Sequence, residues 1–196
     1  MKTLDLFVVE LEKPVNDEIT LNNGAKLYLD SKFNEFEWRV TEGPVVCAPF
    51  KHDTGVEEGD TLYFHHLVVM NEGQVLTGHE NHYVVRFDPD HTINNQAIGY
   101  KSSKSGHIYT LAGWTLIKPE FVEEEVSSDL IEVVSLEDKS TTRGTIGFDA
   151  PWLKEMDVCA GDTVVFRDKM QYKITIDDVV YYRVRCEDLM YVEEEV

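Results

Sequence analysis

The chain has 196 residues, of which 42% are hydrophobic and 28% charged, and its formal net charge is −19 at pH 7. This balance disfavours nucleic acids and anionic membrane surfaces as partners, because proteins bind both through clustered Lys and Arg side chains. The apolar content is high enough for a packed core, so we expect a folded acidic protein rather than a disordered one.

The N-terminal residues and the cysteines indicate a cytoplasmic protein. Met1-Lys2 leads into no signal-type apolar run, and no stretch has the length needed to span a bilayer. The three cysteines at positions 47, 159 and 186 include no C-x-x-C pair and do not make an even disulfide framework. We therefore expect reduced thiols and a reducing compartment.

In the first half of the chain, apolar and aromatic runs bounded by turn residues predict four strands. These strands are Leu4 to Leu11, Trp38 to Val46, Thr61 to Val69, and His82 to Phe87. A long stretch of low order, Val15 to Glu37, separates the first two. Loops of this length are uncommon in compact domains and are usually functional or disordered. The polar run Lys101 to Gly106 ends this half and is typical of a linker.

The second half repeats this arrangement. Its expected strands are Trp114 to Ile117, Thr163 to Phe166, Tyr172 to Ile176, and Val179 to Arg185. A second stretch of low order, Glu123 to Thr142, again follows the first strand. No segment carries a sustained 3.6-residue apolar stripe of helix length, so short strands with polar turns predict an all-β fold of antiparallel barrels.

Four blocks of sequence occur twice in the same order. The clearest is V-x-x-G-D-T-(L/V)-x-F, at Val56 to Phe64 and again at Val158 to Phe166. The other pairs are Leu11 to Pro14 with Leu116 to Pro119, Arg39 to Gly43 with Arg143 to Gly147, and Tyr83 to Asp88 with Tyr182 to Glu187. Ordered blocks at a nearly constant offset indicate a tandem duplication. The predicted domains are residues 1–105, with an insertion, and residues 106–196.

The second half resembles the GroES-type co-chaperonins along most of its length. The matching segments are an opening strand at Trp114 to Lys118, a loop exit at Lys139 to Gly144, the signature strand at Val158 to Phe166, and a closing strand at Glu187 to Val192. The first half is similar but diverges at its end. The resemblance implies two tandem GroES-like antiparallel β-barrels.

The resemblance also implies a function. Co-chaperonins of this family form a ring that caps the chamber of an ATP-driven, GroEL-like chaperonin and so assists protein folding. A mobile loop on each barrel binds the chaperonin's apical domain through a short apolar sequence. The corresponding residues are Leu27, Tyr28 and Leu29 in the first half and Ile131 and Val133 in the second. Rings would form by self-association or with single-module co-chaperonins.

Two features depart from the family and keep alternatives open. The glycine pair before the loop tripeptide is reduced to Gly24 in the first half and is absent in the second. The segments Pro44 to Thr54 and Phe148 to Met156 stand where the family has a roof hairpin. The tripeptides are alternatively ordinary edge strands packed on their own barrels. The alternative function is a non-enzymatic structural or interaction protein, such as a virus-encoded scaffold or capsid accessory.

The sequence offers no catalytic constellation. Gly78-His79-Glu80 is similar to the zinc-ligand Gly-His-Glu of medium-chain alcohol dehydrogenases, but the following glycines, a suitable Cys and a dinucleotide motif are missing. Asp60 and Asp162 occupy equivalent positions of the two copies, so duplication explains the pair without chemistry. We expect no enzyme, no cofactor and no metal.

Overall fold

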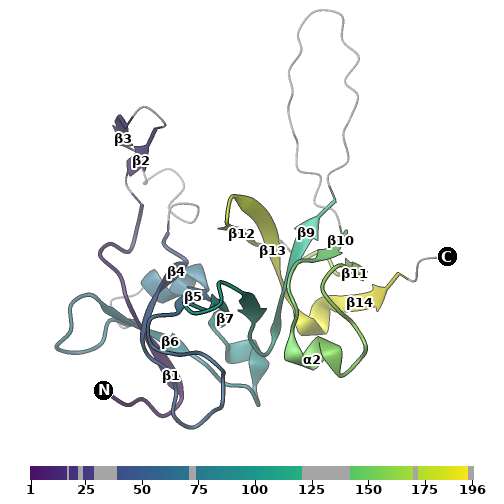
Figure 1. Cartoon of the computed structure of the whole chain (residues 1–196), viewed down its shortest axis with the longest axis horizontal. Helices are drawn as coiled ribbons and strands as arrows, with labels where there is room; N and C mark the ends of the chain where they lie inside the picture. Colours follow the sequence, from purple (N-terminus) through teal and green to yellow (C-terminus); the bar gives the residue numbers. More distant parts are fainter. Residues whose placement is uncertain are drawn as a thin grey trace, which may run out of the picture. The chain divides into compact units, whose positions relative to one another are not determined.

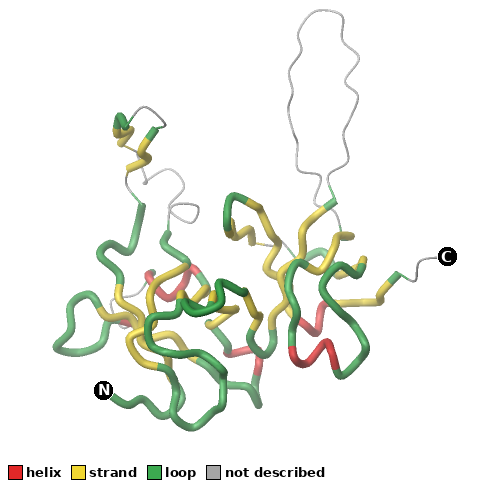
Figure 2. The backbone as a smooth tube through the Cα atoms, in the orientation of Figure 1, coloured by secondary structure: helices red, strands yellow, loops and turns green. Residues whose placement is uncertain are grey.

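The computed structural model describes residues 1–16, 18–21, 24–28, 39–70, 74–120, 142–169 and 172–193, which form two compact units, Met1–Gly113 and Trp114–Val196 (Figure 1). Each unit is built on a six-stranded antiparallel sheet, so the predicted all-β class is confirmed. The described residues contain one short α-helix, α2 (Pro151–Lys154), and strands and loops dominate the trace (Figure 2). No helix in this part of the chain is long and apolar enough to cross a membrane.

The first unit holds six strands in the order β6-β1-β4-β5-β7-β8. Their bounds are β1 (Leu6–Glu10), β4 (Glu42–Cys47), β5 (Thr61–Phe64), β6 (His82–Arg86), β7 (Ala97–Lys101) and β8 (Ile108–Thr110). Two further strands, β2 (Glu18–Thr20) and β3 (Lys26–Tyr28), form a separate two-stranded sheet. One 3₁₀ turn, η1 (His66–Val69), follows β5, and another, η3 (Thr92–Asn94), precedes β7.

The second unit has the strand order β12-β13-β9-β10-β11-β14. Its elements are β9 (Trp114–Pro119), β10 (Arg143–Ile146), β11 (Thr163–Phe166), β12 (Tyr172–Ile176), β13 (Val179–Arg185), η4 (Cys186–Asp188) and β14 (Leu189–Val192). Five neighbouring strands therefore correspond in the two units, with β6-β1-β4-β5-β7 matching β13-β9-β10-β11-β14.

The register shows that the correspondence extends to individual residues. Val45 N–H donates to Asp60 O at 2.8 Å, and Ile146 N–H donates to Asp162 O at 2.9 Å. The sheet is irregular at the same place in both copies, between Tyr63 and Phe64 and between Val165 and Phe166. The described parts of the units are thus copies of one strand arrangement, as a duplication requires.

The register also corrects two of the sequence alignments. Val9 lies opposite Val45 and Tyr83, and Ile117 lies opposite Ile146 and Tyr182, so Val9 and Ile117 are counterparts. The match of Leu11 to Pro14 with Leu116 to Pro119 was therefore wrong. Arg39 to Gly43 was likewise aligned out of register, because Gly43 and Gly144 occupy the same place opposite Leu62 and Val164. Two of the four sequence matches therefore align the copies out of register, although the strands themselves correspond.

The repeated G-D-T block is a turn that feeds a strand. Gly59 and Gly161 adopt positive φ angles of 89° and 101°, a conformation that favours glycine. The following aspartates close the turns, since Asp60 Oδ2 accepts the Glu57 N–H and Asp162 Oδ2 accepts the Cys159 N–H, both at 2.9 Å. The block recurs because both copies need this turn.

Each unit has its own apolar core on one face of its sheet. Alternate strand residues point to the same face, so counterparts in the two copies enter the two cores together. These pairs are Val9 with Ile117, Leu62 with Val164, Phe64 with Phe166, Tyr83 with Tyr182, and Val85 with Val184. In the second unit, α2 adds Leu153 to the core.

The polar run 101–106 is not a linker, contrary to the sequence prediction. It forms the turn between β7 and β8, and Ser102 N–H donates to His107 O at 2.9 Å. Ser103 fixes the turn to the sheet, because its N–H and Oγ both donate to Asp60 Oδ1 at 2.8 and 2.9 Å. The predicted division at residue 105 falls within this turn, whereas the first unit extends to Gly113.

Candidate functional site

The first long loop leaves its sheet through a stem, residues 14–15 and 39–40, whose two sides are joined by backbone contacts. Val40 N–H donates to Pro14 O at 3.0 Å, and Val15 pairs antiparallel with Arg39. Arg39 is buried, so this bridge belongs to the folded unit. The chain between these pairs departs from the end of β1 and returns just before β4.

A short hairpin lies within this loop and is formed by β2 and β3. Its register pairs Glu18 with Tyr28 and Thr20 with Lys26. The turn is closed by the Leu21 N–H donating to Ala25 O and the Gly24 N–H donating to Leu21 O, both at 2.8 Å. An ion pair between Lys26 Nζ and Glu18 Oε1, 2.9 Å long, joins the strands across one face. The sequence predicted low order here and did not find this hairpin.

Two of the predicted binding residues lie on this hairpin with their side chains exposed. Leu27 is 51% exposed and Tyr28 is 75% exposed. Neighbouring strand residues point to opposite faces, so neither face of β3 is buried. Among the described residues β3 pairs only with β2, so it is not an edge strand of its own six-stranded sheet. The hairpin therefore presents unpaired apolar surface to solvent.

The remaining predicted binding residues, Leu29, Ile131 and Val133, lie outside the residues that the structure describes. The structure does describe where the second loop begins and ends. Pro119 of β9 pairs with Gly144 of β10, and Arg143 donates to the carboxylates of Glu120 and Glu193. The hydrogen bond from Arg143 lowers the pKa of the Glu193 carboxyl. The second loop thus leaves its sheet between the counterparts of β1 and β4.

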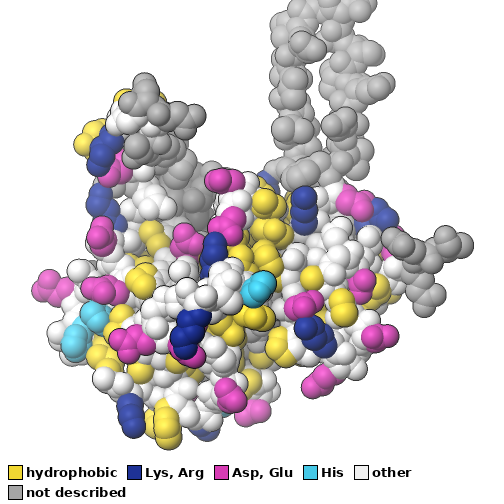
Figure 3. Space-filling view, viewed as in Figure 1, with side chains coloured by type: hydrophobic (Ala, Val, Ile, Leu, Met, Phe, Trp, Pro, Cys, Tyr) yellow, Lys and Arg dark blue, Asp and Glu magenta, His cyan; other side chains and the backbone are white. Residues whose placement is uncertain are grey.

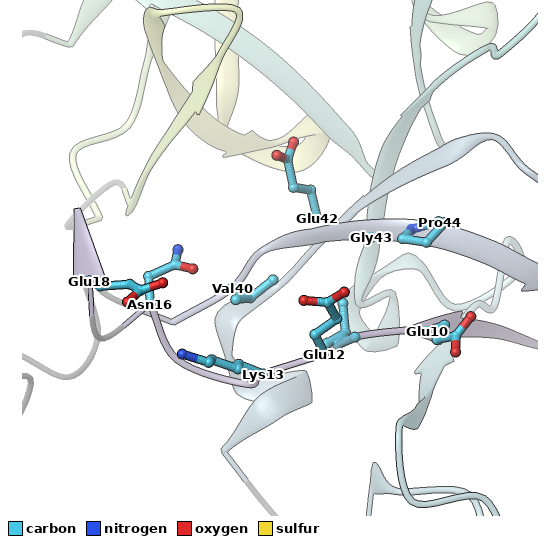
Figure 4. Close-up of a pocket in the computed structure, with 10 residues that line it drawn as sticks. Glu10, Glu12, Lys13, Asn16, Glu18, Val40, Glu42, Gly43 and Pro44 are labelled. Carbon is cyan, nitrogen blue, oxygen red and sulfur yellow. The ribbon is translucent and has the colours of Figure 1, made fainter. Parts of the chain in front are cut away.

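A groove of about 660 Å³ lies at the stem of the first loop and was not predicted from the sequence (Figure 4). Its ionisable lining is four glutamates and one lysine: Glu10, Glu12, Glu18, Glu42 and Lys13. No group of three or more His, Cys, Asp or Glu in the described residues has the geometry to hold a metal ion. The only sequence signal for the groove was the local density of glutamates. Acidic side chains are also spread over the surface in Figure 3, so the groove continues a general feature of the protein.

Four histidines of the first unit, one of them His79 of the Gly-His-Glu sequence, lie in two pairs. The rings of His65 and His66 are 4.3 Å apart, and those of His79 and His82 are 5.0 Å apart. His65 Nδ1 accepts the Leu67 N–H at 3.2 Å and so caps η1, while His66 is buried. The cap formed by His65 and the burial of His66 show that both side chains contribute to the fold of the first unit.

The sequence was compared with known protein families and with curated proteins. No family model matches the chain, and no curated protein matches it. The resemblance to GroES-type co-chaperonins therefore rests on the motifs of the sequence itself.

Proposed function

We propose that this protein is a tandem co-chaperonin whose β2–β3 hairpin binds the apical domains of an ATP-driven, GroEL-like chaperonin. The chain would cap the folding chamber and assist protein folding without catalysing a reaction itself. The observation that carries the proposal is the exposure of Leu27 and Tyr28 on a hairpin whose stem is held to the sheet. In this proposal each six-stranded sheet belongs to a GroES-like barrel.

The energetics of such a contact suit reversible capping. Complete burial of a leucine-sized side chain contributes about 1.5–3 kcal/mol. Two such side chains on one hairpin give a weak contact, because association itself costs translational and rotational freedom. Several hairpins presented together recover affinity through effective concentration. The proposal therefore includes self-association or assembly with single-module co-chaperonins.

The test is retention of the purified chain by a GroEL-like chaperonin with and without ATP. We expect ATP-dependent retention of the wild type. The double variant Leu27→Ser, Tyr28→Ser should lose roughly a hundredfold in affinity, because about 3 kcal/mol of apolar burial is removed. Ile93→Ser is the matched control, since Ile93 is 67% exposed on η3 of the same unit. It should bind as the wild type does.

The second candidate is a non-enzymatic structural or interaction protein. The formed hairpin favours it, because the Lys26–Glu18 ion pair and the closed turn suit a permanent contact better than a loop that orders on binding. No retention of the wild type in any nucleotide state would reject the co-chaperonin and leave this candidate.

A further inference from the structure

Two histidines lie at the ends of a tight turn that leads into β6. His79 O accepts the His82 N–H at 3.1 Å, and this hydrogen bond closes the turn over Glu80 and Asn81. The centres of the two imidazole rings are 5.0 Å apart, and their planes make an angle of 47°. The turn therefore brings two imidazoles close together in the first unit.

Backbone contacts hold this turn in place. Leu76 N–H donates to His82 O at 2.7 Å, and His79 N–H donates to Leu76 O at 2.9 Å. Leu11 N–H, just beyond the end of β1, donates to Asn81 O at 2.9 Å and so ties the turn to the six-stranded sheet. A ligand would therefore meet two imidazoles whose backbone positions are already fixed.

The ring nitrogens of this pair are not used by the fold. In the described part of the chain, no hydrogen bond or ion pair joins either imidazole to another group. His79 is exposed and His82 is half-buried, so both rings are within reach of solvent. The other close pair differs, because His65 Nδ1 accepts the Leu67 N–H and His66 is buried.

The site is a feature of the first unit alone. Gly78 has a φ of +84°, a conformation that favours glycine, and it bends the chain at the start of the turn. His82 precedes Tyr83, and the counterpart of Tyr83 in the second unit is Tyr182, so the counterpart of His82 is Tyr181. The sequence from residue 114 to residue 196 contains no histidine.

The separation of the rings matches that of two imidazoles bound to one metal ion. A Zn–N bond of about 2.0–2.1 Å, added to about 1.1 Å from the nitrogen to the ring centre, places the metal about 3.2 Å from each centre. Two rings at that distance and at a tetrahedral angle have centres about 5.2 Å apart. The observed 5.0 Å lies close to this value, so rotation about side-chain bonds suffices to direct one nitrogen of each ring to a shared ion.

We propose that His79 and His82 form a bidentate site for a divalent transition-metal ion such as Zn²⁺. Imidazole nitrogen suits Zn²⁺, Cu²⁺ and Ni²⁺, whereas Ca²⁺ and Mg²⁺ prefer oxygen ligands. No third His, Cys, Asp or Glu completes the set among the described residues, so water fills the remaining coordination positions. The ion is held more weakly than in zinc sites with three or four protein ligands. The site does not depend on chaperonin binding.

The acidic surface of the chain is the main competitor for added metal. With a net charge of −19, its carboxylates attract Zn²⁺, but they attract Ca²⁺ as well, which imidazoles do not favour. Zn²⁺ titrations are therefore made in excess Ca²⁺. All chains carry Cys159→Ser, because the exposed native thiol is also a zinc ligand.

The first test is calorimetric titration of these chains with Zn²⁺. We expect one site per chain, and an affinity at least roughly tenfold lower in His79→Gln and in His82→Gln, because each change removes one of two linked ligands. His91→Gln is the matched control, since His91 is an exposed histidine of the same unit, and it should bind as the parent chain does. Absence of a site that survives Ca²⁺, or unchanged affinity in either variant, would overturn the proposal.

The second test locates the ion by NMR. Zn²⁺ should shift the imidazole C–H signals of His79 and His82 together, with one midpoint. It should also slow hydrogen exchange of the His82 amide, because the ion binds the closed turn. Glu80→Gln should leave the midpoint unchanged, which separates the imidazole pair from the carboxylate between them. Shifts confined to one imidazole, or a midpoint that moves with Glu80→Gln, would reject the bidentate site.

Discussion

At the scale of single residues, the two aspartates of the repeated block have diverged in their surroundings. Both close their own turn, but Asp60 is buried and also accepts the N–H and Oγ of Ser103. Burial raises the pKa of the Asp60 carboxyl. The hydrogen bonds from Glu57 and Ser103 and the charge of Lys104 together lower it by more, so the pKa lies below its ordinary value. Asp60 thus joins the signature turn to the β7–β8 turn.

This difference predicts unequal costs for the same substitution. Asp60→Ala should lower the free energy of unfolding by about 2–3 kcal/mol, because three partly buried hydrogen bonds from Glu57 and Ser103 lose their charged acceptor. Asp162→Ala should cost about 1 kcal/mol, since the Cys159 N–H, which loses its acceptor, is exposed to water. Urea unfolding of the two variants measures both costs. Equal costs would mean that the Ser103 contacts add no stability.

At the scale of elements, periodicity predicted the strands that have alternating or β-branched residues. Thr163 to Phe166, Tyr172 to Ile176 and Val179 to Arg185 were predicted with the bounds that the structure has. β7 was missed because Gly99 lies in its middle and glycine is depleted in strands. Glycine is needed at position 99 because Tyr109 O approaches closely, and no local pattern in the sequence reveals this tertiary contact.

The candidate site was predictable only in part. The resemblance marked the tripeptide Leu27-Tyr28-Leu29 in the first loop, and the two of these residues that the structure describes, Leu27 and Tyr28, are exposed on β3. The hairpin itself was not predicted, because its strands have three residues each and its stability depends on a single turn and a cross-strand ion pair. The acidic groove was not predicted either, since its glutamates come together only when β1 and β4 pair.

The turn of the hairpin gives a prediction at this scale. Gly24 has a φ of +80° and no atom within 4 Å of an added Cβ, so the cost of Gly24→Ala is purely one of backbone conformation. That cost is about 1 kcal/mol. Hydrogen exchange of the amides of Leu21 and residue 24, whose N–H groups close the turn, should accelerate several-fold, with unchanged exchange in the strands of the six-stranded sheet. Global destabilisation by the substitution would contradict a hairpin that is separate from the sheet.

At the scale of the whole molecule, one arrangement of five strands occurs twice, and the sixth strand lies at a different edge of the sheet in each unit. The first unit closes its β7 edge with β8, whereas the second adds β12 beside β13 and leaves the β14 edge without a described partner. The copies therefore agree in the strands that build each core and differ at the edges of their sheets.

Net charge decides how the self-association included in the proposed function responds to salt. Copies that each carry a formal charge of −19 repel one another at long range. Salt screens the repulsion, since the Debye length falls from about 14 Å near 0.05 M to about 4 Å near 0.5 M. The dissociation constant for self-association should therefore fall several-fold over that range in sedimentation experiments. Weaker association at high salt would instead show that ion pairs between copies outweigh the repulsion of their net charges.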